Sequence, residues 1–332
     1  MERYYRRTGL LSLALLLAAP CAFAKDKNPE HDPEQIGNRD VGKGVNFYSM
    51  EREIGLGKEM ALETERQAKM VDDSAVTEYV NRLVQTVAHN SDAKVPFSIK
   101  VVDSDEVNAF ALPGGFMFVN TGLILKADNE AELAGVLAHE IAHVAARHGT
   151  RQATRGQLVN YSTIPLIFMG GWAGYAVRQA VGLAVPLGFL KFSRNMEAEA
   201  DLLGLQYMYR AGYDPTEFVN FFERIQTLEQ KKPGAVSKLF STHPMTGDRI
   251  RAAQKTIQQD LKAAPRYVVD TSEFHDARTR LIMLGNRLKL REDPGRPVLH
   301  TRSSAKVDQG AQADRNNKTD DGDSERPTLR RN

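Results

Sequence analysis

Apolar residues recur at helical spacing over most of the chain, whereas strand-like patterns are short and confined to one stretch. The helical periodicity predicts helices over residues 50–70, 73–89, 129–148, 194–210, 214–229, 246–261 and 272–289. Residues 97–102 alternate like a strand, and residues 108–111 and 116–119 are short apolar runs separated by Pro113-Gly114-Gly115. We therefore expect an α+β fold that is mostly helical, with a small β-sheet beside the helix over 129–148.

The first 24 residues have the pattern of a secretory signal. A basic start precedes an apolar run over 10–19, and Ala22-Phe23-Ala24 forms an A-x-A cleavage site. That run is too short to span a membrane comfortably as an anchor helix. Cys21 raises a lipoprotein alternative, but Pro20 before it argues against lipid modification. Cleavage after Ala24 would remove the only cysteine, so neither a disulfide nor thiol catalysis is expected.

Composition divides the rest of the 332-residue chain into a folded part between two polar ends. Residues 25–49 are polar and predict an extended N-terminal segment. Residues 299–332 have almost no large apolar side chains and predict a disordered tail, which leaves 50–298 for the folded domain. A net charge of +2 without a long basic tract argues against a nucleic-acid partner.

The helix predicted over 129–148 carries the motif H-E-x-x-H, from His139 to His143. Residues four apart share a helix face, so both imidazoles can bind one metal ion, and Glu140 can reach a water on that metal. These are the groups of a zinc hydrolase. Asn129 is the expected N-cap and Gly149 the expected C-terminal cap. The alternative is a chance motif on a solvated helix.

A second candidate segment is the helix that Ser193 is expected to cap. Glu197 and Asp201 lie four residues apart and share a face. Glu197 fits the third protein ligand of a catalytic zinc, and Asp201 can accept a hydrogen bond from the far nitrogen of a ligand histidine. Glu199 points to another face and ranks below Glu197. The alternative is an acidic, solvated helix start that the helix dipole favours.

A third candidate segment contains His243 and Arg249. Pro244 pushes His243 out of the helical region, which places that histidine on an extended or turn segment before a helix. From there His243 can reach a metal site, and Arg249 falls near the first turn of the helix. An ordinary loop histidine is the alternative.

In combination, these motifs resemble the zinc metallopeptidases related to the CAAX prenyl protease and the heat-shock protease of the bacterial inner membrane. The resemblance is closest to the soluble periplasmic branch typified by the β-barrel assembly-enhancing protease. Residues 107–125 add a fourth matching block, so that the resemblance covers about residues 50–290. It implies a gluzincin-like metallopeptidase domain with one Zn²⁺ per chain. The tetratricopeptide array of the soluble branch and the clean spanning helices of the membrane branch are not recognisable here.

The resemblance also implies a role for each candidate residue. The three implied zinc ligands are His139, His143 and Glu197. Glu140 matches the general base, and Asp201 the carboxylate beside a ligand. His243 matches a histidine that either binds zinc at rest or stabilises the oxyanion. Arg249 matches an arginine near the site and is, with His243, the second catalytic candidate for stabilising the oxyanion.

Two apolar segments have candidate roles in binding. Metallopeptidases of the gluzincin type hold substrate against an edge strand, which the run Phe116, Met117, Phe118 and Val119 can supply, although a purely core strand is the alternative. Residues 164–190 form two apolar halves, each too short to span a membrane. We expect two short helices beside the active site, with contact to a membrane surface as the alternative.

These observations predict a periplasmic zinc endopeptidase that hydrolyses unfolded or misassembled proteins, outer-membrane proteins above all, in protein quality control. Its expected partners are such polypeptides and the outer-membrane assembly machinery. A chaperone-like protein that binds outer-membrane proteins, with latent or no proteolysis, is the main alternative. A zinc hydrolase of small substrates is disfavoured, because the chain has no small-ligand motif.

Overall fold

The computed structural model describes residues 29–159, 192–231 and 243–292. The chain divides into two units, 1–288 and 289–332, and the fold belongs to the first. Three predicted features lie outside the described residues: the signal over 1–24, the apolar segment over 164–190 and the tail over 299–332. Among the described residues, no helix is long and apolar enough to cross a membrane.

A three-stranded sheet forms the β part of the fold, in the order β1-β3-β2. β3 (Phe116–Asn120) runs parallel to β1 (Ser98–Val102) and antiparallel to β2 (Ala109–Leu112). Gly114 and Gly115 make the turn between β2 and β3 with φ values of +77° and +90°, which side chains other than glycine rarely adopt. The predicted strands and turn are thus confirmed.

The position of β3 contradicts one prediction. Phe116, Met117, Phe118 and Val119 were expected to offer an edge to substrate, but β3 is the central strand and is paired on both sides. The prediction is wrong because strand order depends on long-range pairing, which a local apolar run does not specify. Among the described residues, β1 and β2 are the edge strands, and β1 has a further isolated bridge between Val102 and Met70.

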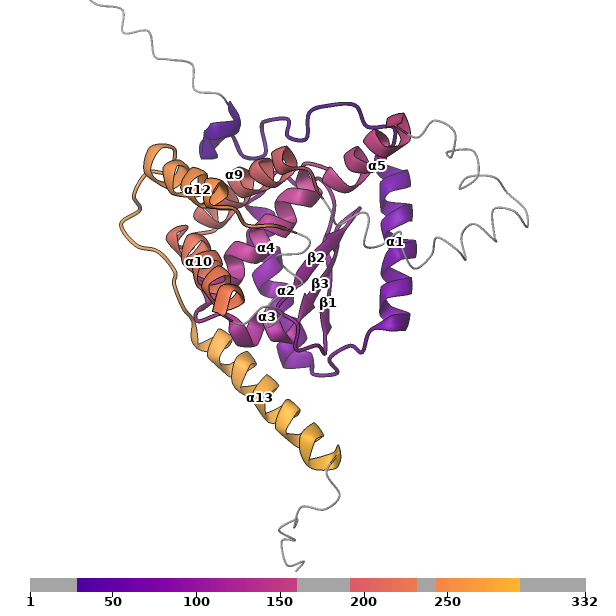
Figure 1. Ribbon diagram of the computed structural model, residues 1–332, viewed down its shortest axis with the longest axis vertical. Helices are drawn as coiled ribbons and strands as arrows, with labels where there is room; N and C mark the ends of the chain where they lie inside the picture. Colours follow the sequence, from indigo (N-terminus) through magenta and orange to yellow (C-terminus); the bar gives the residue numbers. More distant parts are fainter. Residues whose placement is uncertain (1–28, 160–191, 232–242, 293–332) are drawn as a thin grey trace, which may run out of the picture. The chain divides into compact units, whose positions relative to one another are not determined.

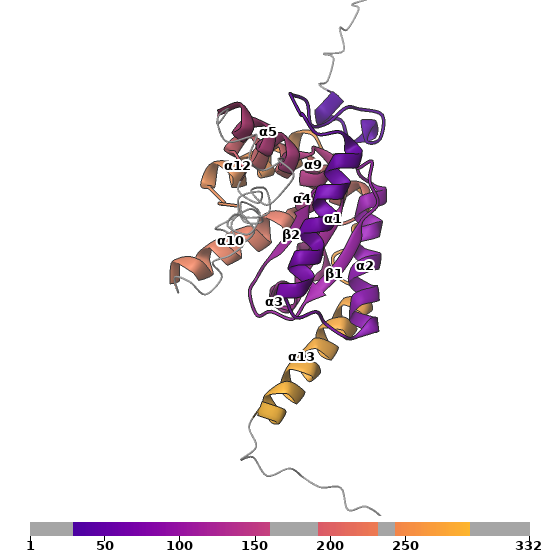
Figure 2. The ribbon, with the colours of Figure 1, turned by 90° about the vertical axis from the view of Figure 1, so that its right-hand side faces the viewer.

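Helices cover both faces of the sheet, as period-two alternation requires. On one face, Phe118 and Leu112 pack with Met60 and Ala61 of α1 (Met50–Gln67). On the other face, the strands belong to a larger core with α2 (Ser74–His89) and α4 (Glu130–Ala145). Figure 1 shows α1 on one side of the sheet with α4 on the other, and Figure 2 shows α1 in front of the strands.

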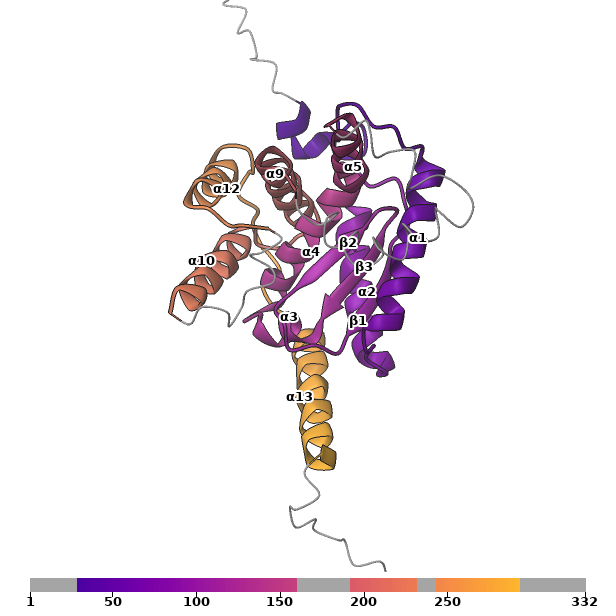
Figure 3. The ribbon, with the colours of Figure 1, turned by 45° about the vertical axis from the view of Figure 1, so that its right-hand side comes forward.

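The remaining described helices complete a mostly helical fold, which confirms the expected class. They are α3 (Thr121–Lys126), α5 (His148–Val159), α9 (Arg194–Arg210), α10 (Thr216–Lys231), α12 (Gly247–Gln259) and α13 (Ser272–Glu292). α4 packs against α2, α9, α10 and β2, and Figure 3 shows it beside the strands. The H-E-x-x-H helix is therefore at the centre of the fold.

The C-terminal end of α4 differs from its prediction. α4 ends at Ala145, and Gly149 lies inside α5 instead of capping α4. Arg147 separates the two helices with a φ of +55°, which is uncommon for a residue with a side chain. Its guanidinium donates to Glu53 at 2.6 Å and to the Tyr48 carbonyl at 2.7 Å. These tertiary contacts fix a helix break that the local sequence does not show.

The N-terminal segment, residues 29–49, is anchored to the domain. It contains two short 3₁₀ helices, Pro29–His31 and Pro33–Gln35. Arg39 forms a buried ion pair with Asp92 at 2.9 Å, and the Tyr207 hydroxyl donates to the same carboxylate at 2.9 Å. This segment therefore packs against the helices instead of only leading into them.

Candidate active site

The site is built on the contact between α4 and α9. Gly204 of α9 lies against α4 so closely that a Cβ there would be 3.0 Å from the His139 Cα. Ser193 caps α9 by accepting a hydrogen bond from the Met196 N–H, as predicted. Because the helices approach so closely, the carboxylates on the facing side of α9 reach the histidines of α4.

Four buried side chains converge on one point, which defines the candidate metal centre. Ligand atoms of His139, His143, Glu197 and His243 all lie within 4.8 Å of one another. The Nε2 atoms of His139 and His143 are 3.0 Å apart. Glu197 Oε1 lies 2.9 Å from His243 Nδ1 and 3.7 Å from His143 Nε2. The structure thus brings together the predicted ligands from two helices and adds the loop histidine.

This group of side chains fits a metal cation. His139 Nδ1 faces the carboxylate of Asp201, so a neutral His139 ring carries its proton there and directs the lone pair of Nε2 at His143 Nε2, 3.0 Å away, where a cation can bind. Glu140 Oε1 and His243 Nε2 are buried and have no hydrogen-bond partner among the described residues. Burial lowers the pKa of His139, but Asp201 and Glu197 outweigh it and raise that pKa to about 9. The centre therefore favours positive charge.

Asp201, itself bound by Arg249, contacts His139 on the side of the ring that faces away from the metal centre. Asp201 Oδ1 lies 3.1 Å from His139 Nδ1, so His139 Nδ1–H faces a carboxylate and its Nε2 faces the metal centre. Burial raises the pKa of Asp201, but the hydrogen bonds from Arg249 and His139 leave it lowered overall. Asp201 is therefore a charged acceptor. The structure places it where the sequence predicted.

Glu140 is positioned beside the metal centre by the edge of the sheet. Its Oε2 accepts a hydrogen bond from the Ala111 N–H of β2 at 3.0 Å, and its Oε1 lies 3.5 Å from His243 Nε2. Burial raises the pKa of Glu140. A raised pKa makes a carboxylate a stronger proton acceptor, which suits the role of a general base.

The sequence reasoning missed a second set of residues behind His143. His148 lies 2.9 Å from His143, between their Nδ1 atoms, and its Nε2 lies 3.1 Å from Glu199 Oε2. Arg151 Nη1 also donates to Glu199 Oε2, at 3.1 Å. As predicted, Glu199 faces away from the ligands of the metal centre. The spacing of five residues between His143 and His148 was the available signal, but a continuous helix would have turned His148 aside.

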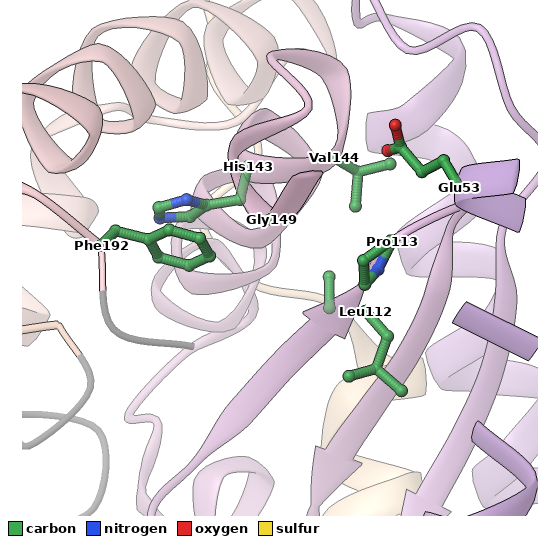
Figure 4. A pocket seen from close by; sticks show the side chains of 8 residues that line it. Glu53, Leu112, Pro113, His143, Val144, Gly149 and Phe192 are labelled. Carbon is green, nitrogen blue, oxygen red and sulfur yellow. The ribbon is translucent and has the colours of Figure 1, made fainter. Parts of the chain in front are cut away.

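A small pocket lies next to His143, between the end of β2 and the start of α5. Its lining residues are Glu53, Ala111, Leu112, Pro113, His143, Val144, Gly149 and Phe192. Figure 4 shows the ring of Phe192 against that of His143, and their centroids are 4.0 Å apart with an interplanar angle of 23°. The pocket is mainly apolar and adjoins both the metal centre and β2.

A buried His-His-Glu group with a further carboxylate beside it is the arrangement that metal-dependent peptidases of the H-E-x-x-H class use. The chain belongs to peptidase family M48, whose profile matches residues 74–257. This is a family of the class that the sequence predicted.

Curated relatives carry related names. The chain is 29% identical over 252 residues to the β-barrel assembly-enhancing protease of Escherichia coli K12, covering 72% of this chain and 50% of that protein. It is 29% identical over 254 residues to the protein of the same name in Yersinia pestis, covering 73% and 51%. It is 32% identical over 185 residues to the mitochondrial metalloendopeptidase OMA1 of Schizosaccharomyces pombe, covering 55% and 53%. The chain thus spans about half the length of these relatives.

Proposed function

We propose that the protein is a zinc-dependent endopeptidase that hydrolyses unfolded or misassembled polypeptides in the periplasm. The observation that carries this proposal is the position of Glu140, whose unpartnered Oε1 lies beside the four-residue metal centre. Two histidines and a glutamate are a ligand set that catalytic zinc uses, with a further position for water or substrate. His139, His143 and Glu197 would hold the ion.

The residues of this chain have distinct tasks in the proposed hydrolysis. Bound zinc would supply Lewis-acid polarisation of the scissile carbonyl and acidify the attacking water. Glu140 accepts the proton of that water and returns it to the amide nitrogen as the peptide bond breaks. Asp201 and Arg249 keep His139 in place during the reaction, because both are buried and paired.

We infer that β2 is the strand against which an extended substrate binds. The Ala111 N–H points away from β3, since it donates to Glu140, and β2 has a strand partner on one side only among the described residues. Backbone pairing along that edge would hold a polypeptide of almost any sequence beside Glu140. Such binding suits an enzyme that acts on unfolded chains.

Localisation and substrate class rest on the sequence and the relatives. The pattern over 1–24 supports export, and the Escherichia coli relative is named for β-barrel assembly. We therefore propose outer-membrane proteins as substrates and their assembly machinery as a partner.

We further propose that the enzyme rests in a latent state in which His243 occupies the fourth ligand position. His243 is buried and lies 2.9 Å from Glu197 and 3.4 Å from His139 Nε2. Substrate would displace His243, which then becomes free to stabilise the oxyanion. A protein that only binds its clients would also keep this position closed, so the chaperone-like alternative predicts the same resting geometry.

The test is cleavage of an unfolded reporter protein by residues 25–332 and by the Glu140→Gln variant at equal zinc content. Glu59→Gln is the control, because Glu59 is an exposed residue of α1. We expect cleavage by the wild type and the control, and a loss of at least about 100-fold in Glu140→Gln. Equal cleavage by Glu140→Gln would refute the proposed base. Binding of the reporter without cleavage by any variant, His243→Ala included, would favour the chaperone-like role.

A further inference from the structure

A chain of hydrogen bonds runs from the far side of His143 to the N-terminal segment. His143 Nδ1 lies 2.9 Å from His148 Nδ1, and His148 Nε2 lies 3.1 Å from Glu199 Oε2. His148 is completely buried. None of these contacts is made by the metal-facing nitrogen of His143, which is Nε2.

The proton of each hydrogen bond in this series can be assigned by starting at the Glu199 carboxylate and proceeding to His148 and then His143. An ionised carboxylate only accepts hydrogen bonds, so His148 Nε2 carries a proton for Glu199. Neutral His148 then has a bare Nδ1, which must accept from His143 Nδ1–H. His143 Nε2 is left with its lone pair directed at the metal centre. Glu199 thus sets the tautomer of a residue that it does not touch.

The N-terminal segment fixes Glu199 in turn. The Gly42 N–H donates to Glu199 Oε1 at 3.3 Å, and Arg151 donates to Glu199 Oε2 and to the Lys43 carbonyl, at 3.1 and 2.6 Å. Gly42 has a φ of +76°, and a Cβ on it would lie 2.4 Å from the Ala146 carbonyl oxygen. Residues 42–43 are therefore fitted against the end of α4, just before His148.

We propose that His148 is a positioning residue for the metal ligand His143, and that Glu199, held by residues 42–43, fixes the tautomer of both histidines. The two ligand histidines of α4 are then oriented differently. His139 faces the carboxylate of Asp201 directly, whereas His143 reaches Glu199 through His148. Partners behind a ligand histidine typically change metal affinity by about 10- to 100-fold. The inference rests on the proposed metal site.

The test compares His148→Asn with His148→Gln in residues 25–332. The Asn side-chain oxygen can stand at the Nδ1 position and accept from His143, whereas Gln reaches only the Nε2 position beside Glu199. Zinc affinity is measured by competition with a chromophoric chelator, and ligand geometry by the visible spectrum of the Co²⁺ form. We expect His148→Gln to lose about 10- to 100-fold in zinc affinity and to alter the Co²⁺ spectrum. We expect His148→Asn to keep a zinc affinity and a Co²⁺ spectrum close to those of the wild type.

Two results would overturn the inference. One is an equal loss of zinc affinity in both variants, which would indicate that His148 acts only by packing. The other is wild-type affinity in both. A wild-type chain that binds neither ion would refute the proposed metal site as well, so the two failures are distinguishable. Thermal unfolding of the metal-free chains checks that each variant folds.

A second pair of variants avoids changing any histidine. Gly42→Ala would press a methyl group against Ala146 and displace residues 42–43 from Glu199. Gly37→Ala is the matched control, because Gly37 has a similar φ of +85° in the same segment and nothing within 4 Å of the added Cβ. We expect weaker zinc binding in Gly42→Ala than in Gly37→Ala, and a larger loss of stability in Gly42→Ala because its methyl group meets Ala146. Equal affinity in this pair would refute the role of residues 42–43.

Discussion

Arg249 donates two parallel hydrogen bonds to Asp201, from Nε to Oδ2 at 2.6 Å and from Nη2 to Oδ1 at 2.7 Å. The third nitrogen, Nη1, lies 2.9 Å from both Glu197 Oε2 and the Pro244 carbonyl. The Arg249 guanidinium thus connects the proposed ligand Glu197, the His139 partner Asp201 and the loop that carries His243. Because its nitrogens are committed to these contacts, Arg249 acts through its neighbours and is not directed at a substrate carbonyl.

Arg249→Lys is expected to weaken zinc binding by about 10- to 100-fold, because an ammonium cannot replace the planar fork. Asp201 and Glu197 would then share a single point charge, and His139 would lose its fixed partner. Arg251→Lys is the control, since Arg251 is an exposed residue of the same helix that pairs with Asp248. Competition with a chelator measures the affinity. Unchanged affinity in Arg249→Lys would show that the fork is dispensable.

Much of the site could be predicted because it depends on geometry within single helices. His139 and His143, like Glu197 and Asp201, are pairs at a spacing of four residues, and the α-helix alone places each pair on one face. His243 was identified because Pro244 excludes it from the following helix. These inferences needed no knowledge of how the helices pack.

The missed features all depend on contacts between distant parts of the chain. α4 ends where it does because Arg147 bonds to Glu53, a residue 94 positions earlier. That break turns His148 toward His143 and Glu199, which a continuous helix would not do. The central position of β3 likewise follows from its pairing with β1. No local apolar pattern contains this information.

Gly57→Ala is expected to destabilise the fold by about 1–3 kcal/mol or more, because the added methyl group overpacks the contact between α1 and the sheet. The Cβ would lie 1.7 Å from the Pro113 carbonyl oxygen, next to the end of β2. Gly55→Ala is the matched control in α1, since nothing lies within 4 Å of its Cβ, and it should gain about 0.5–1 kcal/mol from helix propensity. Urea unfolding at equal zinc content measures both. An unchanged free energy of unfolding in Gly57→Ala would show that α1 can move away from the turn.

Removal of the metal is expected to lower the melting temperature, because it leaves three imidazoles and two carboxylates buried around an uncompensated centre. A ligand present at about 1,000 times its Kd stabilises the folded state by about 4 kcal/mol. Calorimetric scans with and without a chelator, followed by added zinc, measure the effect. Recovery with zinc distinguishes metal loss from damage by the chelator. An unchanged melting temperature would contradict tight binding at this centre.

His243→Ala is expected to raise the rate at which an unfolded reporter is cleaved, while His139, His143 and Glu197 retain the zinc. The reason is that His243 lies within 4.8 Å of the three proposed ligands, so its removal would open a position for water and substrate. A gain of about tenfold would place the closed state about 1.4 kcal/mol below the open one. His275→Ala is the control, because His275 lies on α13, where it pairs with Asp270. A loss of activity with zinc retained would instead assign His243 to the oxyanion and argue against latency.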